Sequence, residues 1–357
     1  MKKLLLMLFV SLSAFGQGVN FISGNLRTAF EQAKAQNKPV FIEVFSPTCH
    51  VCASFVPTFE NAAVGQVYNR NFVSYRLDVN SPEGQAFLGK QRIFVPSLPL
   101  FMFWNPDVTL LHALNVNNST DQLIAAATNA LNPAARASGY KNRFLKGERN
   151  PNFLIEHAYF ARIVRDTVSN LAAVNAYVKT QPTSAYANGT NFLVLQKLML
   201  DTDNPLFQHF ITHLPDYRKA HGAQPVREVG ENIVMFTLFS GRAAQFSPEK
   251  VRALGGYLAR LGLDKRTVEN RTLVPELNAL VRTGQIEGAV KRADAYLSGP
   301  AGPREALFLA KFITDRTKDA AARKTASGWL TRFLNKPGTT PEEKRDLQNQ
   351  LAAISRT

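Results

Sequence analysis

The most informative part of the sequence is the stretch Phe41-Ile42-Glu43-Val44-Phe45-Ser46-Pro47-Thr48-Cys49-His50-Val51-Cys52. It opens with an apolar run rich in Phe, Ile and Val, which predicts a buried strand. Ser46-Pro47-Thr48 ends that strand, and a helical pattern follows. Thr48 is a suitable N-cap, so we expect Cys49 in the first helical turn and Cys52 one turn later on the same side.

The spacing of the two cysteines suits thiol–disulfide exchange. Two sulfurs three residues apart at the start of a helix can form a small disulfide ring with little backbone movement. Unpaired N–H groups and the positive end of the helix dipole also stabilise a thiolate on the first cysteine. The motif therefore predicts a redox-active pair.

A CxxC pair can also belong to a metal site or to a structural disulfide. Structural zinc needs four Cys or His ligands, and the only two cysteines of the chain are both here. A disulfide that closes so short a loop constrains the unfolded chain little. A copper(I) site at Cys49, His50 and Cys52 is chemically sensible and stays open as an alternative, although adjacent Cys and His side chains diverge on one helical turn.

Residues outside the motif carry a resemblance to a known family. Glu43 lies six residues before Cys49, and Pro57 lies eight after it. Pro99 precedes an apolar run, Leu100-Phe101-Met102-Phe103. On these matches, residues from about 25 to 131 resemble a thioredoxin-family domain, most closely the secreted bacterial subgroup.

The resemblance implies a role for each matching residue. Cys49 would be the nucleophile and Cys52 the residue that resolves the mixed disulfide. Glu43 would exchange protons with Cys52, because a buried carboxyl has a raised pKa and can take a proton near neutral pH. An exposed Glu43 at a strand edge is the alternative. Pro99 would be the cis-proline that faces the disulfide, and Pro57 would kink the active-site helix. The expected substrate groove consists of Thr48, Leu98 and Pro99.

Three positions depart from the family pattern. Thr48 replaces the usual Trp before the first cysteine, and Ala53 replaces a frequent Lys after the second. His50 occupies the first position between the cysteines rather than the second. An imidazolium beside Cys49 would favour its thiolate and make the disulfide a stronger oxidant. These departures concern the redox potential and the substrate preference rather than the fold.

The first sixteen residues have the organisation of a secretory signal peptide. Lys2 and Lys3 precede an apolar run, residues 4–10, and small residues lead to Gly16. A transmembrane anchor would need about 18 apolar residues. We expect cleavage near Gly16 and a periplasmic or secreted protein, in a compartment where disulfides persist. No cysteine stands at the junction, which argues against a lipid anchor.

The remainder divides by its periodicity into residues 17–132 and 133–357. The first part alternates helices and strands and ends in a hairpin and a helix, which is the element order of a thioredoxin fold. The second part shows only helical patterns, with some helix pairs of tetratricopeptide-like size. The predicted fold class is therefore an α/β thioredoxin fold, with a mixed sheet flanked by helices, followed by an all-α domain.

Composition and the remaining motifs limit the function. The net charge of +15 comes from scattered Lys and Arg residues, which argues against a nucleic-acid partner. His209 and His213 lack the Glu of a zinc-protease motif, and no motif suggests a cofactor. We expect an exported thiol–disulfide oxidoreductase that acts on protein substrates and exchanges electrons with a membrane or periplasmic redox partner. The helical domain would hold a partner protein. The alternative is a helical adaptor, or a copper-binding protein, with a thioredoxin scaffold.

Overall fold

The computed structural model describes residues 18–356 and divides the chain into two compact units. The first contains the residues up to Thr183 together with Gln196–Leu198, and the second contains Ser184–Leu195 and the residues from Met199 onward. The predicted signal peptide, residues 1–16, lies outside the described residues. Within residues 18–356, no helix is both long enough and apolar enough to cross a bilayer.

The first unit is built on a four-stranded mixed sheet of order β2-β1-β3-β4. Strand β1 pairs in parallel with β2 and antiparallel with β3, and β3 pairs antiparallel with β4. The strands are β1 (Val40–Phe45), β2 (Val73–Asp78), β3 (Leu100–Trp104) and β4 (Leu110–Leu114). This order and the flanking helices confirm the predicted thioredoxin fold.

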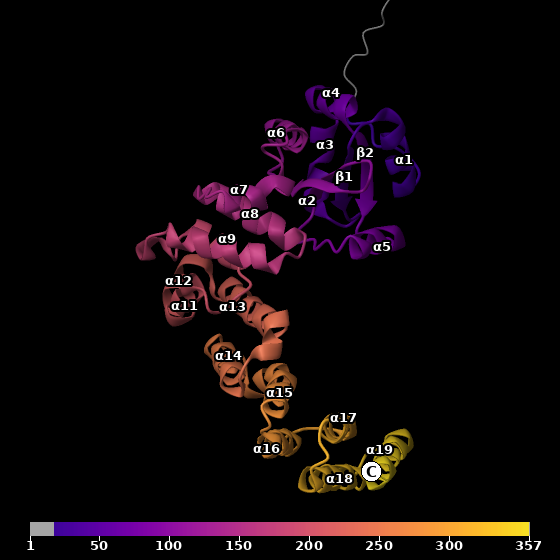
Figure 1. Ribbon diagram of the computed structural model, residues 1–357, viewed down its shortest axis with the longest axis vertical. Coiled ribbons are helices and arrows are strands. Elements are labelled where there is room, and N and C mark those ends of the chain that lie inside the picture. The colour runs from indigo at the N-terminus through magenta and orange to yellow at the C-terminus, as the bar shows by residue number, and fades with distance from the viewer. Residues whose placement is uncertain (1–17, 357) are drawn as a thin grey trace, which may run out of the picture. The chain divides into compact units, whose positions relative to one another are not determined.

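Helices cover both faces of the sheet (Figure 1). Their bounds are α1 (Leu26–Gln36), α2 (His50–Ser54), α3 (Val56–Phe59), α4 (Ala62–Asn71), α5 (Pro82–Lys90) and α6 (Thr120–Leu131). On one face, side chains of α1 and α5 pack with Val40, Ile42 and Val44. On the other, side chains of α3, α4 and α6, together with Phe55 between α2 and α3, pack with Phe41. The two cores follow from the alternation of side chains along β1.

The helix starts follow local signals in the sequence. The side chains of Asn25, Ser81 and Ser119 each accept a hydrogen bond from a backbone N–H of the first turn, at the starts of α1, α5 and α6. These caps satisfy donors that the helix itself leaves unpaired.

The first compact unit continues past α6 into four helical segments. They are η1 (Ala137–Gly139), α7 (Tyr140–Leu145), α8 (Pro151–Ile163) and α9 (Thr167–Lys179). Helix α8 packs against α9 and against β4. Its last residue, Ile163, is fully buried in the core cluster that holds Met102 and Trp104. The predicted boundary at Asn132 therefore lies inside this compact unit, and independent folding of residues 17–132 stays a prediction.

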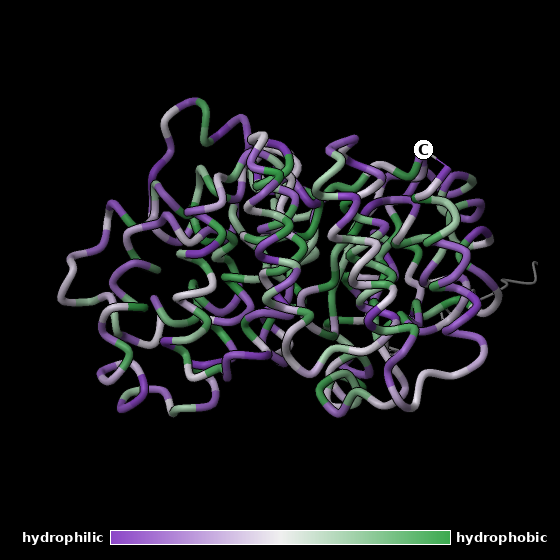
Figure 2. Tube along the Cα trace, turned by 90° about the horizontal axis from the view of Figure 1, so that it is seen from below, coloured by the Kyte–Doolittle hydropathy of each residue, from purple (hydrophilic) through white to green (hydrophobic). Residues whose placement is uncertain are grey.

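The second unit contains helices and no strand among its described residues, as predicted. Sequential helices pack as neighbours, for example α14 with α15 and α17 with α18 (Figure 1). Hydrophobic and hydrophilic residues alternate at short intervals along the chain (Figure 2), and buried apolar residues between Leu273 and Ile354 form one core cluster. Its helices are α10 (Gly189–Lys197), α11 (Pro205–Thr212), α12 (Leu214–His221), α13 (Ala223–Leu238), η3 (Gly241–Gln245), α14 (Pro248–Arg260), α15 (Lys265–Arg282), α16 (Ile286–Leu297), α17 (Pro303–Thr314), α18 (Ala320–Leu334) and α19 (Pro341–Ser355).

The packing of α8 leads to a prediction about fragments. A fragment of residues 18–183 should be more stable than one of residues 18–131, because the shorter one loses Ile163 from a buried cluster. Burial of one large apolar side chain contributes about 1.5–3 kcal/mol, so the free energy of unfolding should differ by at least that much. Urea denaturation followed by circular dichroism measures the difference. Equal midpoints for the two fragments would show that residues 132–183 do not stabilise the sheet domain.

Candidate functional site

The cysteine motif lies where β1 ends and α2 begins. The hydroxyls of Ser46 and Thr48 are 3.1 Å apart, and the N–H of Cys49 donates to the carbonyl of Ser46 at 3.0 Å. Cys49, not Thr48, is the N-cap of α2, and its Sγ accepts a hydrogen bond from the N–H of Cys52 at 3.1 Å. The prediction that Thr48 caps the helix is therefore wrong: its hydroxyl pairs with Ser46, and the helix begins one residue later.

Cys49 and Cys52 form a disulfide with their Cα atoms 5.2 Å apart. Cys49 is half-buried, whereas Cys52 is 1% exposed. His50 and Val51, which lie between them, are both exposed. The pair thus combines one partly exposed cysteine with one buried cysteine.

The helix that begins after Cys49 is interrupted at Phe55. Helix α2 ends at Ser54, and α3 starts at Val56 with Pro57 in its first turn. A proline cannot donate the backbone hydrogen bond that a continuous helix would need there. Phe55 is 1% exposed and contacts Phe101 of β3 edge to face, with ring centroids 5.3 Å apart.

Glu43 is fully buried in β1, directly opposite Arg76 of β2. Its Oε2 accepts a hydrogen bond from Nε of Arg76 at 2.7 Å, while Oε1 is buried with no hydrogen-bond partner among the described residues. The Arg76 guanidinium also lies over the Phe45 ring, 4.3 Å from its centroid. The alternative of a water-facing Glu43 at a strand edge is therefore wrong.

Burial raises the pKa of Glu43 above its ordinary value of 4.5, and the charge and hydrogen bond of Arg76 oppose that shift without cancelling it. A carboxyl in this environment can hold or release a proton closer to neutral pH than an exposed glutamate can. Sequence reasoning did not find Arg76. The feature of the sequence that could have revealed it is a charged residue among the alternating apolar residues of β2, the strand that pairs in parallel with β1.

The segment of residues 97–99 lies at the same end of the sheet as the cysteines. Leu100, which starts β3, pairs with Val44 near the end of β1. The Leu98–Pro99 bond is cis, as the family resemblance implied. Pro99 is buried, Leu98 is half-buried and Thr48 is exposed. Thr48 follows β1, and Leu98 and Pro99 precede β3. The end of β1 and the start of β3 are neighbours, so the three expected groove residues belong to the same end of the sheet.

Metal binding has no support in the described part of the chain, where no group of three His, Cys, Asp or Glu side chains could hold an ion. His209 and His213 stack on each other with ring centroids 4.0 Å apart. Nδ1 of His209 is 3.2 Å from the hydroxyl of Tyr217. In the disulfide form, Cys49 and Cys52 cannot act as thiolate ligands.

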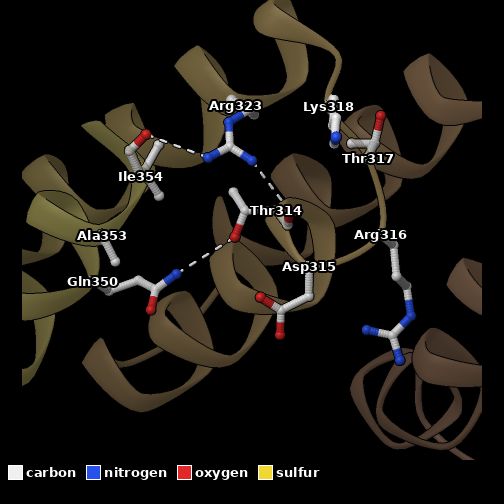
Figure 3. Close-up of a pocket in the computed structure, with 9 residues that line it drawn as sticks. All are labelled: Thr314, Asp315, Arg316, Thr317, Lys318, Arg323, Gln350, Ala353 and Ile354. Atoms are coloured by element: carbon white, nitrogen blue, oxygen red, sulfur yellow. Dashed lines mark hydrogen bonds between the residues drawn. The ribbon is translucent and has the colours of Figure 1, made fainter. Parts of the chain in front are cut away.

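A cavity of about 470 Å³ in the second unit lies between the end of α17 and α19 (Figure 3). Arg323 donates to the carbonyls of Thr314 and Ile354, both at 3.3 Å, and Gln350 donates to the Thr314 hydroxyl at 3.4 Å. The residues that line the cavity include no cysteine or histidine. Both cysteines of the chain, Cys49 and Cys52, belong instead to the first unit.

Comparison with known proteins finds similarity over parts of the chain. Residues 18–123 match the family model described as "Thioredox_DsbH: Protein of unknown function, DUF255". A segment of 51 residues is 43% identical to spermatogenesis-associated protein 20 of Rattus norvegicus. A segment of 51 residues is likewise 43% identical to the uncharacterized protein B0495.5 of Caenorhabditis elegans. Each match covers 14% of this chain but only 6% and 7%, respectively, of those two proteins.

Two solved structures are similar to this chain over a comparable part. A solution structure from Bacteroides thetaiotaomicron, described as a "putative disulphide-isomerase", is 21% identical with a TM-score of 0.27, and the match covers 30% of this chain and 89% of that one. A disulphide isomerase from Xylella fastidiosa Temecula1 is 14% identical with a TM-score of 0.22, and the match covers 32% and 91%. The family match, the order of the sheet and the Cys49–Cys52 pair together identify the N-terminal part of the chain as a member of the thioredoxin-like family.

Proposed function

We propose that this protein is an exported thiol–disulfide oxidoreductase that exchanges disulfides with protein substrates through Cys49 and Cys52. The observation that carries the proposal is the asymmetric disulfide at the start of α2, with Cys49 half-buried and Cys52 buried. Export is supported by the signal-peptide pattern of residues 1–16.

In the reduced protein, the Cys49 thiolate attacks one sulfur of a substrate disulfide. A mixed disulfide forms, and the other substrate sulfur leaves as a thiolate. The Cys52 thiolate then attacks Sγ of Cys49 and displaces the second substrate sulfur. The substrate gains two electrons, and the Cys49–Cys52 disulfide forms. The reverse sequence oxidises a dithiol substrate.

The environments of the two sulfurs support these roles. The N–H of Cys52 donates to Sγ of Cys49 at 3.1 Å, and such a donor stabilises a thiolate. Burial of Cys52 disfavours its anion, so Cys52 needs a base before it can attack. Glu43 is our candidate for that base. Burial raises its pKa, while the charge and the hydrogen bond of Arg76 still favour the ionised carboxylate.

Trapping of covalent intermediates tests the assignment of the sulfurs. Cys52→Ser should accumulate mixed disulfides with exported proteins that dissolve on adding reductant, because nothing resolves them. Cys49→Ser should trap almost nothing. Non-reducing gels of periplasmic extracts make the comparison, with the double variant as the control. Equal trapping by both single variants would contradict the assignment.

Insulin reduction by the purified protein tests the proposed activity itself. We expect turnover with dithiothreitol as the electron source. No turnover together with tight copper(I) binding would instead favour the copper-binding alternative.

Glu43→Gln should change how stability depends on pH. The raised pKa means that the folded protein binds more protons at Glu43 than the unfolded chain does, so this group lowers the free energy of unfolding as pH rises. The loss begins near the unfolded pKa and is complete above the folded pKa, and its size is about 1.4 kcal/mol for each pH unit that separates the two pKa values. Urea denaturation of both proteins between pH 4 and pH 9 measures this. As pH rises through that range, the free energy of unfolding of the variant should increase relative to that of the wild type. A constant difference at every pH would mean that the Glu43 pKa is not raised.

His50→Ala should lower the reduction potential of the pair. A protonated imidazole beside Cys49 favours its thiolate and therefore the reduced form, and about 30 mV corresponds to about 1.4 kcal/mol for two electrons. Equilibration with glutathione buffers measures the potential. Val51→Ala, at the neighbouring exposed position, is the matched control. An unchanged potential in His50→Ala would show that the exposed imidazole does not affect the pair.

A further inference from the structure

Helix α8 reaches the 97–99 segment although it lies outside the residues that match the family model. The hydroxyl of Tyr159, in α8, donates a hydrogen bond to Oδ1 of Asn115, the residue that follows β4. The amide nitrogen of Asn115 donates in turn to the carbonyl of Ser97 at 3.3 Å and to the carbonyl of Pro99. The Ser97 hydroxyl closes the network by donating to Oδ1 of Asn115 at 3.2 Å.

The end of α8 also holds the residues just before this segment. The N–H of Phe94 donates to the carbonyl of Ile163 at 2.8 Å. The guanidinium of Arg162 lies over the Phe94 ring, 5.1 Å from its centroid. Val95 and Leu98 pack against the core cluster to which Ile163 belongs. Helix α8 therefore contacts residue 94 through its backbone and residues 97–99 through Asn115.

These contacts matter because the segment has little structure of its own. Residues 94–97 belong to no helix or strand, and residues 94–98 are all half-buried. Their backbone has no ladder of hydrogen bonds to define it, so its course depends on the groups that surround it. Of those groups, Tyr159 and Ile163 come from α8.

The segment lies where a protein substrate would approach. Leu100 pairs with Val44, and the chain continues from the end of β1 through residues 46–48 to Cys49. A substrate chain that brings a disulfide to the half-buried Cys49 would therefore meet this end of the sheet. A small disulfide reagent, in contrast, needs access only to the Cys49 sulfur.

We propose that Tyr159 and Asn115 are positioning residues that set the conformation of residues 97–99 for protein substrates, so that α8 controls substrate affinity without altering the cysteine chemistry. The inference rests on the proposed thiol–disulfide exchange activity. The Tyr159 hydroxyl is suited to the role, because burial raises its pKa and keeps it a donor at physiological pH.

Tyr159→Phe tests the proposal by removing only the hydroxyl. With insulin as the protein substrate, KM should rise roughly three- to tenfold, as expected for one lost hydrogen bond, while kcat stays the same. The rate with the small disulfide 5,5′-dithiobis(2-nitrobenzoate) and the reduction potential should both be unchanged. A purely structural role would lower the two rates together or leave both unchanged.

Tyr140→Phe is the matched control. The Tyr140 hydroxyl donates to Oε2 of Glu156 at 3.0 Å and so joins α7 to α8 without touching Asn115. This variant should lose a comparable hydrogen bond and keep the insulin KM of the wild type.

A double-mutant cycle tests whether Tyr159 acts through Asn115. Asn115→Ala should raise the insulin KM at least as much as Tyr159→Phe does. Adding Tyr159→Phe to Asn115→Ala should then have no further effect, because coupled residues are not additive. An unchanged insulin KM in Tyr159→Phe, or additive effects in the cycle, would overturn the inference while leaving the proposed function intact. A wild-type protein inactive on both disulfides would overturn both.

Discussion

Strand β1 is buried on both faces, and the rest of the first unit depends on it. Val40, Ile42 and Val44 enter one core and Phe41 the other, all without exposed surface. The strand pairs with β2 on one side and β3 on the other, so its backbone is hydrogen-bonded along both edges. Its last residue leads within four positions to Cys49. The buried strand therefore fixes the position of the redox pair.

Features that depend on local sequence could be predicted. The apolar run of β1 and the CxxC motif that follows it each identified an element correctly, because short-range periodicity and turn residues determine them. The Cys49 cap was missed because Thr is a preferred N-cap residue and Cys is not. The contact between the hydroxyls of Ser46 and Thr48, which engages the Thr48 side chain, forms only in the folded chain.

Features that depend on pairing between distant segments could not be predicted in the same way. Arg76 lies 33 positions after Glu43 and meets it only because β1 and β2 align in that register. Tyr159 lies 44 positions after Asn115. The change from mixed to purely helical patterns after Asn132 marked a change in secondary structure, whereas the extent of the compact unit is decided by side-chain packing such as that of Ile163.

The burial of the Glu43–Arg76 pair separates two electrostatic effects in this protein. Mobile ions screen charges that are exposed to water but act much less on a buried pair. The Glu43 carboxylate is fully buried, and the Arg76 side chain is 33% exposed. The net charge of +15, spread over the chain, acts on approaching molecules through solvent and weakens as ionic strength rises. Ionic strength should therefore govern encounters with charged partners while leaving the Glu43 carboxyl almost unaffected.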